Sequence, residues 1–214
     1  MITFDLETLP TNDAEVIAAL ESTISAPGQY KKPESIAEWM KDNKESALKE
    51  LVAKTSFEGL YGRIACIAWS DGDGVFASSA SGTEREVIEL FYAFLEQSNE
   101  DTFCGHNIVG FDLPFLKHRS IILGIKPPIK LMRAMIAKPW DSCIADTMLL
   151  WSSDSQKRAS MDKLCRAFGI AGKGDFDGSQ VAETWPKDPQ KVIDYCKNDV
   201  RRTELMHKRI TFGR

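Results

Sequence analysis

The sequence has 214 residues, of which 43% are hydrophobic and 27% are charged, and its formal net charge is −4. These values fit one globular domain with a substantial core and exclude a chain that is disordered throughout. No segment has the apolar run that a bilayer requires, and the first residues carry two acids where a secretion signal needs a basic start. Because the five cysteines form no CxxC pair, we expect a reducing compartment and an intracellular, cytoplasmic protein.

The first quarter of the chain begins with a strand pattern and continues with helix patterns. Residues 1–7 alternate apolar and polar side chains with the two-residue period of a strand. Apolar residues at helical spacing follow, which predicts a helical insert at about 11–57. Within this insert, Ser35 and Glu38 have the spacing of a capping box and predict the start of a helix.

The next region predicts a hairpin and then a helix. Residues 62–69 are apolar on both faces, which is typical of a strand inside a sheet. The DGDG sequence at 71–74 predicts a hairpin turn, and 75–80 is the expected returning strand. Thr83 and Glu86 then predict a capping box at the start of the helix.

The remainder of the sequence is mostly helical in pattern. The expected elements are a strand at 102–104 and helices at 111–123, 160–168 and 189–209. Residues 144–151 fit a strand and a helix equally well, and the proline-containing residues 124–140 predict a loop or short helices. This order of strands and helices indicates an α/β fold in a single domain that spans residues 1–214.

The charge is distributed unevenly along the chain. Residues 113–140 contain six basic and no acidic side chains, which leaves −10 for the rest of the sequence. A second basic group near the C-terminus consists of Arg201, Arg202, Lys208 and Arg209. Two solvated helix faces would account for this pattern, and a track for a polyanion beside an acidic site would account for it equally well.

Two carboxylates share one face of the first expected strand. Asp5 and Glu7 are two residues apart, so their side chains point to the same side and can hold one hard cation. The same spacing recurs elsewhere, where turn or surface acids are the simpler interpretation: Asp71 and Asp73, Glu84 and Glu86, and Asp175 and Asp177. The pattern alone is therefore a weak indication of a metal site.

A tyrosine and an aspartate share one face of the last expected helix. Tyr195 and Asp199 are four residues apart, and their apolar neighbours indicate that this face lies against the core. An unpaired aspartate there would be costly without a cation. A half-buried tyrosine beside a surface acid is the alternative interpretation.

A third group of polar residues lies in GHNIVGFDLPFL at 105–116. His106 and Asn107 follow an expected strand, and Asp112 begins an expected helix. Each has a structural explanation, namely a hydrogen-bonded core histidine, a turn asparagine and an acid that complements a helix N-terminus. As a group they are more specific than any one of them.

Three segments together resemble a known family. FDLET at 4–8, HNIVGFD at 106–112 and YCKND at 195–199 resemble the three motifs of the DEDD superfamily of 3′–5′ exonucleases, in order and in wide separation. The tyrosine four residues before the last aspartate resembles the DEDDy branch. YGRIACIAW at 61–69 and SMDKLCRAFGIAGK at 160–173 are similar to stand-alone exonucleases that resemble the proofreading domain of family-B DNA polymerases.

The resemblance implies a fold, a site and a reaction. The fold is ribonuclease H-like, with three layers and a mixed central sheet flanked by helices. The implied catalytic residues are Asp5, Glu7, Asp112, Tyr195 and Asp199. The four acids would hold two divalent cations, Mg²⁺ or Mn²⁺, and the tyrosine would orient the attacking water. The implied reaction is exonucleolytic hydrolysis from the 3′ end of single-stranded DNA, which releases nucleoside 5′-monophosphates.

The resemblance also implies contacts with the substrate. The candidate substrate-binding residues are Thr8, Leu9, His106, Asn107, Phe111, Phe115 and Lys173. Thr8 and Leu9 would meet the terminal nucleotide, and the two phenylalanines would line the path of a single strand. Lys173 lies in a glycine-rich loop that lacks Walker A spacing, so a phosphate contact and a plain surface charge remain equal alternatives.

Two alternatives stay open from sequence. RNA could replace DNA, because nothing in the sequence discriminates the sugar. A non-catalytic nucleic-acid-binding or partner-docking module of the same fold is a second alternative, which the presence of all four acids disfavours. We expect no membrane partner. Because the sequence shows no polymerase or helicase domain, we expect any replication or repair partner to act in trans. A nucleoid or a phage-infected cell fits the expected intracellular location.

Overall fold

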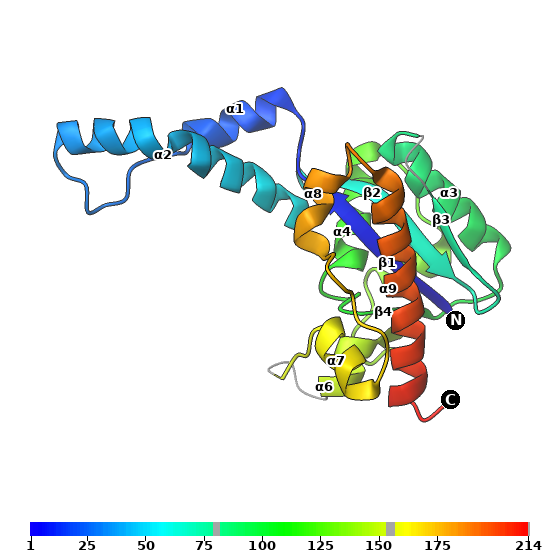
Figure 1. Cartoon of the computed structure of the whole chain (residues 1–214). Coiled ribbons are helices and arrows are strands. Elements are labelled where there is room, and N and C mark those ends of the chain that lie inside the picture. The colour runs from blue at the N-terminus through cyan, green and yellow to red at the C-terminus, as the bar shows by residue number, and fades with distance from the viewer. Residues whose placement is uncertain (79–81, 153–156, 214) are drawn as a thin grey trace.

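A mixed five-stranded sheet forms the centre of the computed structural model, which describes residues 1–78, 82–152 and 157–213 (Figure 1). The strands lie in the order β3-β2-β1-β4-β5. They are β1 (Ile2–Leu9), β2 (Arg63–Ser70), β3 (Val75–Ser78), β4 (Phe103–Gly105) and β5 (Ile144–Asp146). β1 pairs antiparallel with β2 and parallel with β4, so it is the central strand.

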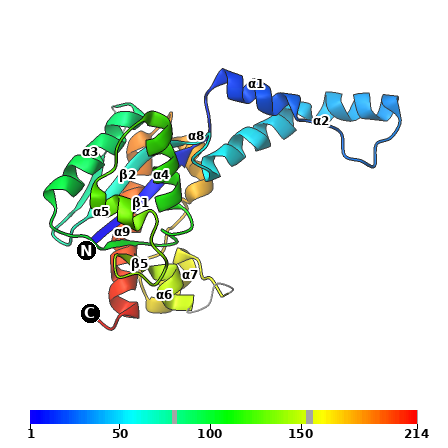
Figure 2. The same ribbon diagram turned by 180° about the vertical axis from the view of Figure 1, so that it is seen from behind.

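Helices cover both faces of the sheet. One face carries α3 (Glu84–Gln97), α4 (Asp112–Leu123) and α5 (Ile129–Ala134), which lie in front of the sheet in Figure 2. The other face carries α8 (Val181–Thr184), which follows the short η2 (Gly178–Gln180), and the long α9 (Pro189–Ile210). Helices α6 (Thr147–Ser152) and α7 (Met161–Phe168) pack against α9 beyond the sheet. The result is the three-layer α/β arrangement that the sequence predicts.

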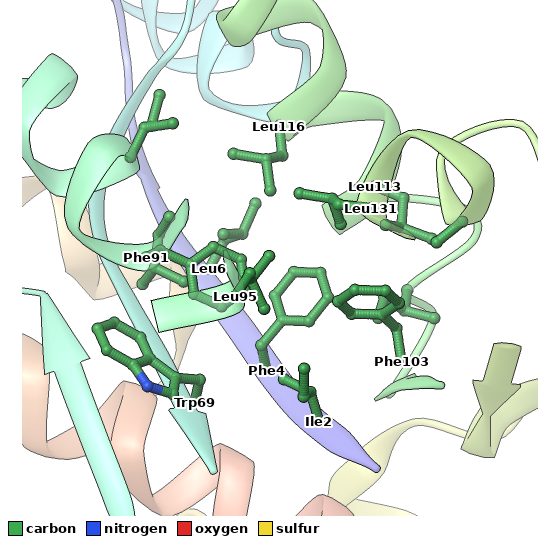
Figure 3. Packing of buried hydrophobic residues seen from close by; sticks show 14 of the residues in the cluster. Ile2, Phe4, Leu6, Trp69, Phe91, Leu95, Phe103, Leu113, Leu116 and Leu131 are labelled. Atoms are coloured by element: carbon green, nitrogen blue, oxygen red, sulfur yellow. The ribbon is translucent and has the colours of Figure 1, made fainter. Parts of the chain in front are cut away.

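The alternation along β1 decides which side chains enter which layer. Ile2, Phe4 and Leu6 point into the core between the sheet and helices α3 to α5 (Figure 3). The Phe4 ring packs against Phe91 at a centroid distance of 5.3 Å and against Phe103 at 6.1 Å. Because side chains alternate along a strand, this packing directs the odd-numbered residues of β1 toward α9.

The layer between the sheet and α9 is a second apolar cluster. Leu9, Cys66 and Ala68 of the sheet pack there against Val192 and Cys196 of α9. The odd face of β1 therefore brings acidic side chains into a layer whose other members are mostly apolar. Burial of charged groups is costly, so the acids in this layer are candidates for a functional site.

The insert forms a helical hairpin that projects away from the sheet in both ribbon views (Figures 1 and 2). It consists of α1 (Ala14–Ser22), α2 (Pro33–Lys54) and the short η1 (Thr55–Phe57), and neither α1 nor α2 contains a buried residue. A hydrogen bond from Thr11 N to Thr55 Oγ1 at 2.8 Å joins the two ends of the insert, and one from Thr8 Oγ1 to the Ser56 carbonyl at 2.7 Å ties its base to β1.

Most local predictions agree with the structure, and one is wrong. The capping box of Thr83 and Glu86 is confirmed, but the one predicted at Ser35 is wrong because α2 already begins at Pro33, a residue suited to the first helical turn. Residues 144–151 are both a strand and a helix in succession. The last two residues of the expected strand 75–80 lie outside the described residues. In the parts of the chain that the structure describes, no helix is long and apolar enough to cross a membrane.

Candidate active site

Asp5 and Glu7 lie side by side on the face of β1 that points toward α9. Their carboxylate oxygens and the thiol of Cys196 all lie within 4.8 Å of one another. Glu7 is buried, and within the residues that the structure describes no group donates a hydrogen bond to its carboxylate. The Cys196 thiol contacts the Asp5 carboxylate at 3.5 Å. The strand pattern thus predicts correctly that the two acids converge.

Asp112 joins this pair from the opposite layer. It is the first residue of α4, and its Oδ1 accepts a hydrogen bond from the backbone N–H of Leu6 at 3.1 Å. Leu6 is the residue between Asp5 and Glu7. Asp112 therefore complements the N-terminus of its helix, as one sequence interpretation held, and at the same time it is bonded to the strand that carries the other acids.

Asp199 and Tyr195 reach the same place from α9, one turn apart on its buried face. Lys173, from the loop before η2, lies between them: its Nζ is 2.6 Å from the Tyr195 hydroxyl and 2.5 Å from Asp199 Oδ2. Arg202 Nη1 lies 2.7 Å from the other oxygen of Asp199. The Tyr195 ring packs edge-on against Phe176.

The acids perturb one another. Burial, together with the nearby charge of Asp199, raises the pKa of Asp5 to about 7. Burial and the charge of Asp5 raise the pKa values of Glu7 and Asp112 well above their usual range. Carboxylates held this close in an apolar layer resist joint ionisation unless a cation joins them. The cluster is therefore poised for a positive ligand.

Tyr195 and the nearby histidine are held in neutral forms. Burial, and next the charge of Asp199, raises the pKa of Tyr195 above its usual range, so the phenol keeps its proton near neutrality while its oxygen accepts a hydrogen bond from Lys173. Burial lowers the pKa of His106, whose Nδ1 lies 2.9 Å from the hydroxyl of Thr147.

Two of the four acids, Asp5 and Asp199, line a cleft, whereas Glu7 and Asp112 lie behind them and do not line it. A cavity of about 390 Å³ is lined by Asp5, His106, Asn107, Met148, Ser160, Met161, Asp162, Lys173 and Asp199. A second cavity of about 380 Å³ adjoins it at Lys173 and contains Tyr195 and Arg202. A larger cavity of about 890 Å³ lies near the C-terminal end of α9 and is lined mainly by apolar residues with none of the four acids. The cleft of about 390 Å³ therefore combines charge with convergent polar groups.

The candidate substrate contacts separate into two groups. His106, Asn107 and Lys173 line the cleft, and Asn107 adopts a left-handed backbone with φ of 67°. Thr8 is half-buried next to Glu7 and bonds to the Ser56 carbonyl.

Three expected contacts are apolar residues, and two of them are corrected. Leu9 is 6% exposed within the cluster below α9, and Phe115 is 2% exposed within the other core, so neither offers a face to a nucleotide. Phe115 lies on the side of α4 that faces the sheet, whereas Phe111 at the start of the helix remains half-buried and packs on Phe115 at 5.6 Å.

Sequence reasoning missed Asp146, which organises the turn beside the cleft. Its carboxylate accepts hydrogen bonds from the backbone N–H groups of Asn107, Val109, Met148 and Leu149. It thereby fixes the GHN turn to the start of α6. An aspartate directly before a helix pattern is a capping signal that could have identified this role. From the sequence alone, Arg202 is one member of a basic group, and Cys196 is one of the apolar neighbours of Tyr195 and Asp199.

The basic stretch of residues 113–140 does not line the acidic cleft. Arg119 is buried in an ion pair with Glu84, and Lys130 donates to the backbone carbonyls of Ser98 and Glu100. Helix α5, which carries Lys130, covers the face of the sheet opposite α9 (Figures 1 and 2). Two of these six basic residues therefore serve the fold, and the basic residue that reaches the site from the second group is Arg202.

The sheet order and the acidic cleft define a nuclease-like α/β domain of the ribonuclease H-like fold. The model of a family of predicted 3′–5′ exonucleases related to the exonuclease domain of PolB matches residues 63–214. The chain belongs to this family. The match begins after β1, so Asp5 and Glu7 lie outside the matched span.

The structure is also similar to the family B DNA polymerase from the hyperthermophilic archaeon Pyrobaculum calidifontis. The TM-score is 0.59 and the sequence identity is 19% over 97% of this chain. The chain spans 24% of that polymerase, so the likeness concerns one part of it and confirms the fold. No curated protein matches the sequence.

Proposed function

We propose that this protein is a metal-dependent 3′–5′ exonuclease that hydrolyses single-stranded DNA and releases nucleoside 5′-monophosphates. The observation that carries the proposal is the convergence of four acids from three elements, Asp5 and Glu7 on β1, Asp112 on α4 and Asp199 on α9, beside one tyrosine hydroxyl. Membership in a family of predicted 3′–5′ exonucleases supports it.

The residues of the cluster fit divalent cations. Carboxylate oxygens are the ligands that Mg²⁺ and Mn²⁺ prefer. Glu7 is buried without a hydrogen-bond donor among the described residues, and burial raises the pKa values of Glu7 and Asp112, as expected for ligands without their cation. Asp5, Glu7, Asp112 and Asp199 would hold the ions. A bound pair would activate the attacking water and stabilise charge on the departing 3′ oxygen.

The other residues position the substrate and the water. The protonated Tyr195 hydroxyl can donate a hydrogen bond to the attacking water and orient it. His106 and Asn107 form the opposite side of the cleft and can contact the terminal nucleotide. The Lys173 ammonium lines the same cleft and supplies positive charge for a phosphate.

The size of the cleft favours a single strand. A cavity of about 390 Å³ is at the small end of the range for sites that bind small ligands. It therefore suits the terminal nucleotide of one strand better than both strands of a duplex end.

The test is digestion of 5′-labelled oligonucleotides by the whole protein. We expect stepwise shortening of single-stranded DNA with Mg²⁺ or Mn²⁺, none with EDTA, and slower attack on a fully paired end. Matched RNA tests the choice of sugar, and faster digestion of RNA would correct the substrate. Protein that binds the oligonucleotide and leaves it intact with both metals would instead support a non-catalytic binding module.

A further inference from the structure

Two cationic side chains hold Asp199 from opposite sides. Lys173 Nζ lies 2.5 Å from Oδ2, and Arg202 Nη1 lies 2.7 Å from Oδ1. The aspartate is 3% exposed, so both contacts are charge-assisted hydrogen bonds shielded from water. Each oxygen of this carboxylate therefore already has a cationic partner.

Arg202 also fixes the loop that carries Lys173. Its Nε donates to the carbonyl of Ala171 at 3.1 Å, and its Nη2 donates to the carbonyl of Gly172 at 2.7 Å. These two residues immediately precede Lys173. The planar fork of a guanidinium can bond a carboxylate and two carbonyls at once, which an ammonium on a flexible stem cannot match. Arg202 thus connects α9 to the glycine-rich loop.

Lys173 is further held by Tyr195. Its ammonium lies 2.6 Å from the hydroxyl and 4.9 Å from the centre of the ring. It occupies a fixed place between the tyrosine and Asp199, at the junction of the two cavities. A flexible surface lysine would make neither contact, so the surface-charge interpretation of Lys173 does not describe this geometry.

We infer that Arg202 is a positioning residue that places the Lys173 ammonium on the Asp199 oxygen a divalent cation needs. Lys173 is then a built-in counter-cation on Oδ2, which would have to leave before a divalent cation could use that oxygen, while Arg202 would stay on Oδ1. This inference rests on the proposed function, because it assumes a metal at the acidic cluster. The loop remains attached to Arg202 when the ammonium leaves Asp199, so the positive charge stays beside the cleft.

The test for Lys173 is Mn²⁺ binding to the protein without DNA, measured by electron paramagnetic resonance of the free ion. Lys173→Met should bind Mn²⁺ about tenfold more tightly than wild type, because the metal no longer breaks a hydrogen bond between two charged groups. Lys163→Met, at an exposed lysine of α7, is the matched control and should bind like wild type. Equal or weaker binding by a folded Lys173→Met overturns the inference.

The test for Arg202 is a double-mutant cycle with the same readout. The gain from Lys173→Met should fall to less than about threefold in the Arg202→Met background, because the loop no longer holds the lysine in place. It should keep its full size in the Arg201→Met background, since the neighbouring arginine is exposed and bonds only Asn198 among the described residues. An equal gain in both backgrounds overturns the positioning role. If Arg202→Met does not fold, Arg202→Lys, which cannot reach both carbonyls, takes its place.

Asp5→Asn separates this inference from the proposed function. If wild type binds no Mn²⁺, or Asp5→Asn binds it as well as wild type does, the metal site itself is wrong. If Asp5→Asn weakens binding and Lys173→Met leaves it unchanged, the metal site stands and the counter-cation is wrong.

Discussion

Asp112 accepts a hydrogen bond from the backbone N–H of Leu6 at 3.1 Å, although the two residues are 106 positions apart. The bond joins the first turn of α4 to the middle of β1. It places the third acid of the cluster next to the strand residue that separates the first two. This single contact converts two remote motifs into one site.

Asp112→Asn tests this double role. The amide keeps an oxygen for the Leu6 N–H but removes the charge that a cation would need. We expect the unfolding temperature of Asp112→Asn in EDTA to match or exceed that of wild type. Burial raises the pKa of the Asp112 carboxyl, which means that folding disfavours its charged form, and a neutral amide avoids this cost. Nuclease activity should fall at least about 100-fold.

Asp112→Ala removes both the charge and the hydrogen-bond acceptor, and it is compared with Asp112→Asn. It leaves the buried Leu6 N–H without its acceptor, so we expect a loss of about 1–3 kcal/mol relative to Asp112→Asn in urea unfolding. Equal stability of the two variants would show that the hydrogen bond contributes nothing to the position of α4.

The metal-free protein should respond to pH through Asp5. Burial, and next the charge of Asp199, raises the pKa of Asp5 from 3.8 to about 7. Between these values the folded state binds more protons at Asp5 than the unfolded state does, so the contribution of this group to stability falls as pH rises. In EDTA, Asp5→Asn should match wild type near pH ~4 and exceed it by about 2–4 kcal/mol near pH ~8.

The quantity to follow with pH is the difference in unfolding free energy between Asp5→Asn and wild type. Burial lowers the pKa values of His106 and His207, which makes the stability of both proteins rise with pH over part of the same window. This opposite trend is common to wild type and variant and cancels in the difference. A gap that stays constant, or one that narrows as pH rises, would contradict the raised pKa of Asp5.

Asp146 should matter for stability more than any exposed acid. Asp146→Ala removes the acceptor for four backbone N–H groups beside the cleft. We expect a loss of about 2–4 kcal/mol in urea unfolding, because several buried donors lose their partner at once. The exposed Asp101 provides the matched control, and Asp101→Ala should change stability by less than about 0.5 kcal/mol. Equal losses of stability in Asp146→Ala and Asp101→Ala would show that the hydrogen bonds to Asp146 do not stabilise the fold.

Local periodicity explains why much of the site could be predicted from sequence. The two-residue period of β1 places Asp5 and Glu7 on one face, and the helical period of α9 does the same for Tyr195 and Asp199. Such patterns depend only on neighbours in the chain. The assignment of catalytic roles to these residues remains a proposal.

Contacts that depend on the path of loops and on packing could not be predicted. The position of Lys173 depends on two hydrogen bonds from Arg202 to the carbonyls of Ala171 and Gly172, which join segments about thirty residues apart. Phe111 and Phe115 have the same residue type one turn apart, and only the packing of α4 against the sheet decides which of them is buried. The wrong prediction at Ser35 has a local cause instead, because Pro33 already occupies the first position of α2.

The most direct test of the central claim is digestion of a 5′-labelled single-stranded DNA by Asp199→Asn beside wild type, in Mg²⁺. Wild type should shorten the strand one nucleotide at a time from its 3′ end. Asp199→Asn, folded to the same extent by circular dichroism, should be at least about 100-fold slower. Undiminished digestion by Asp199→Asn, or an oligonucleotide that wild type leaves intact, would contradict the claim.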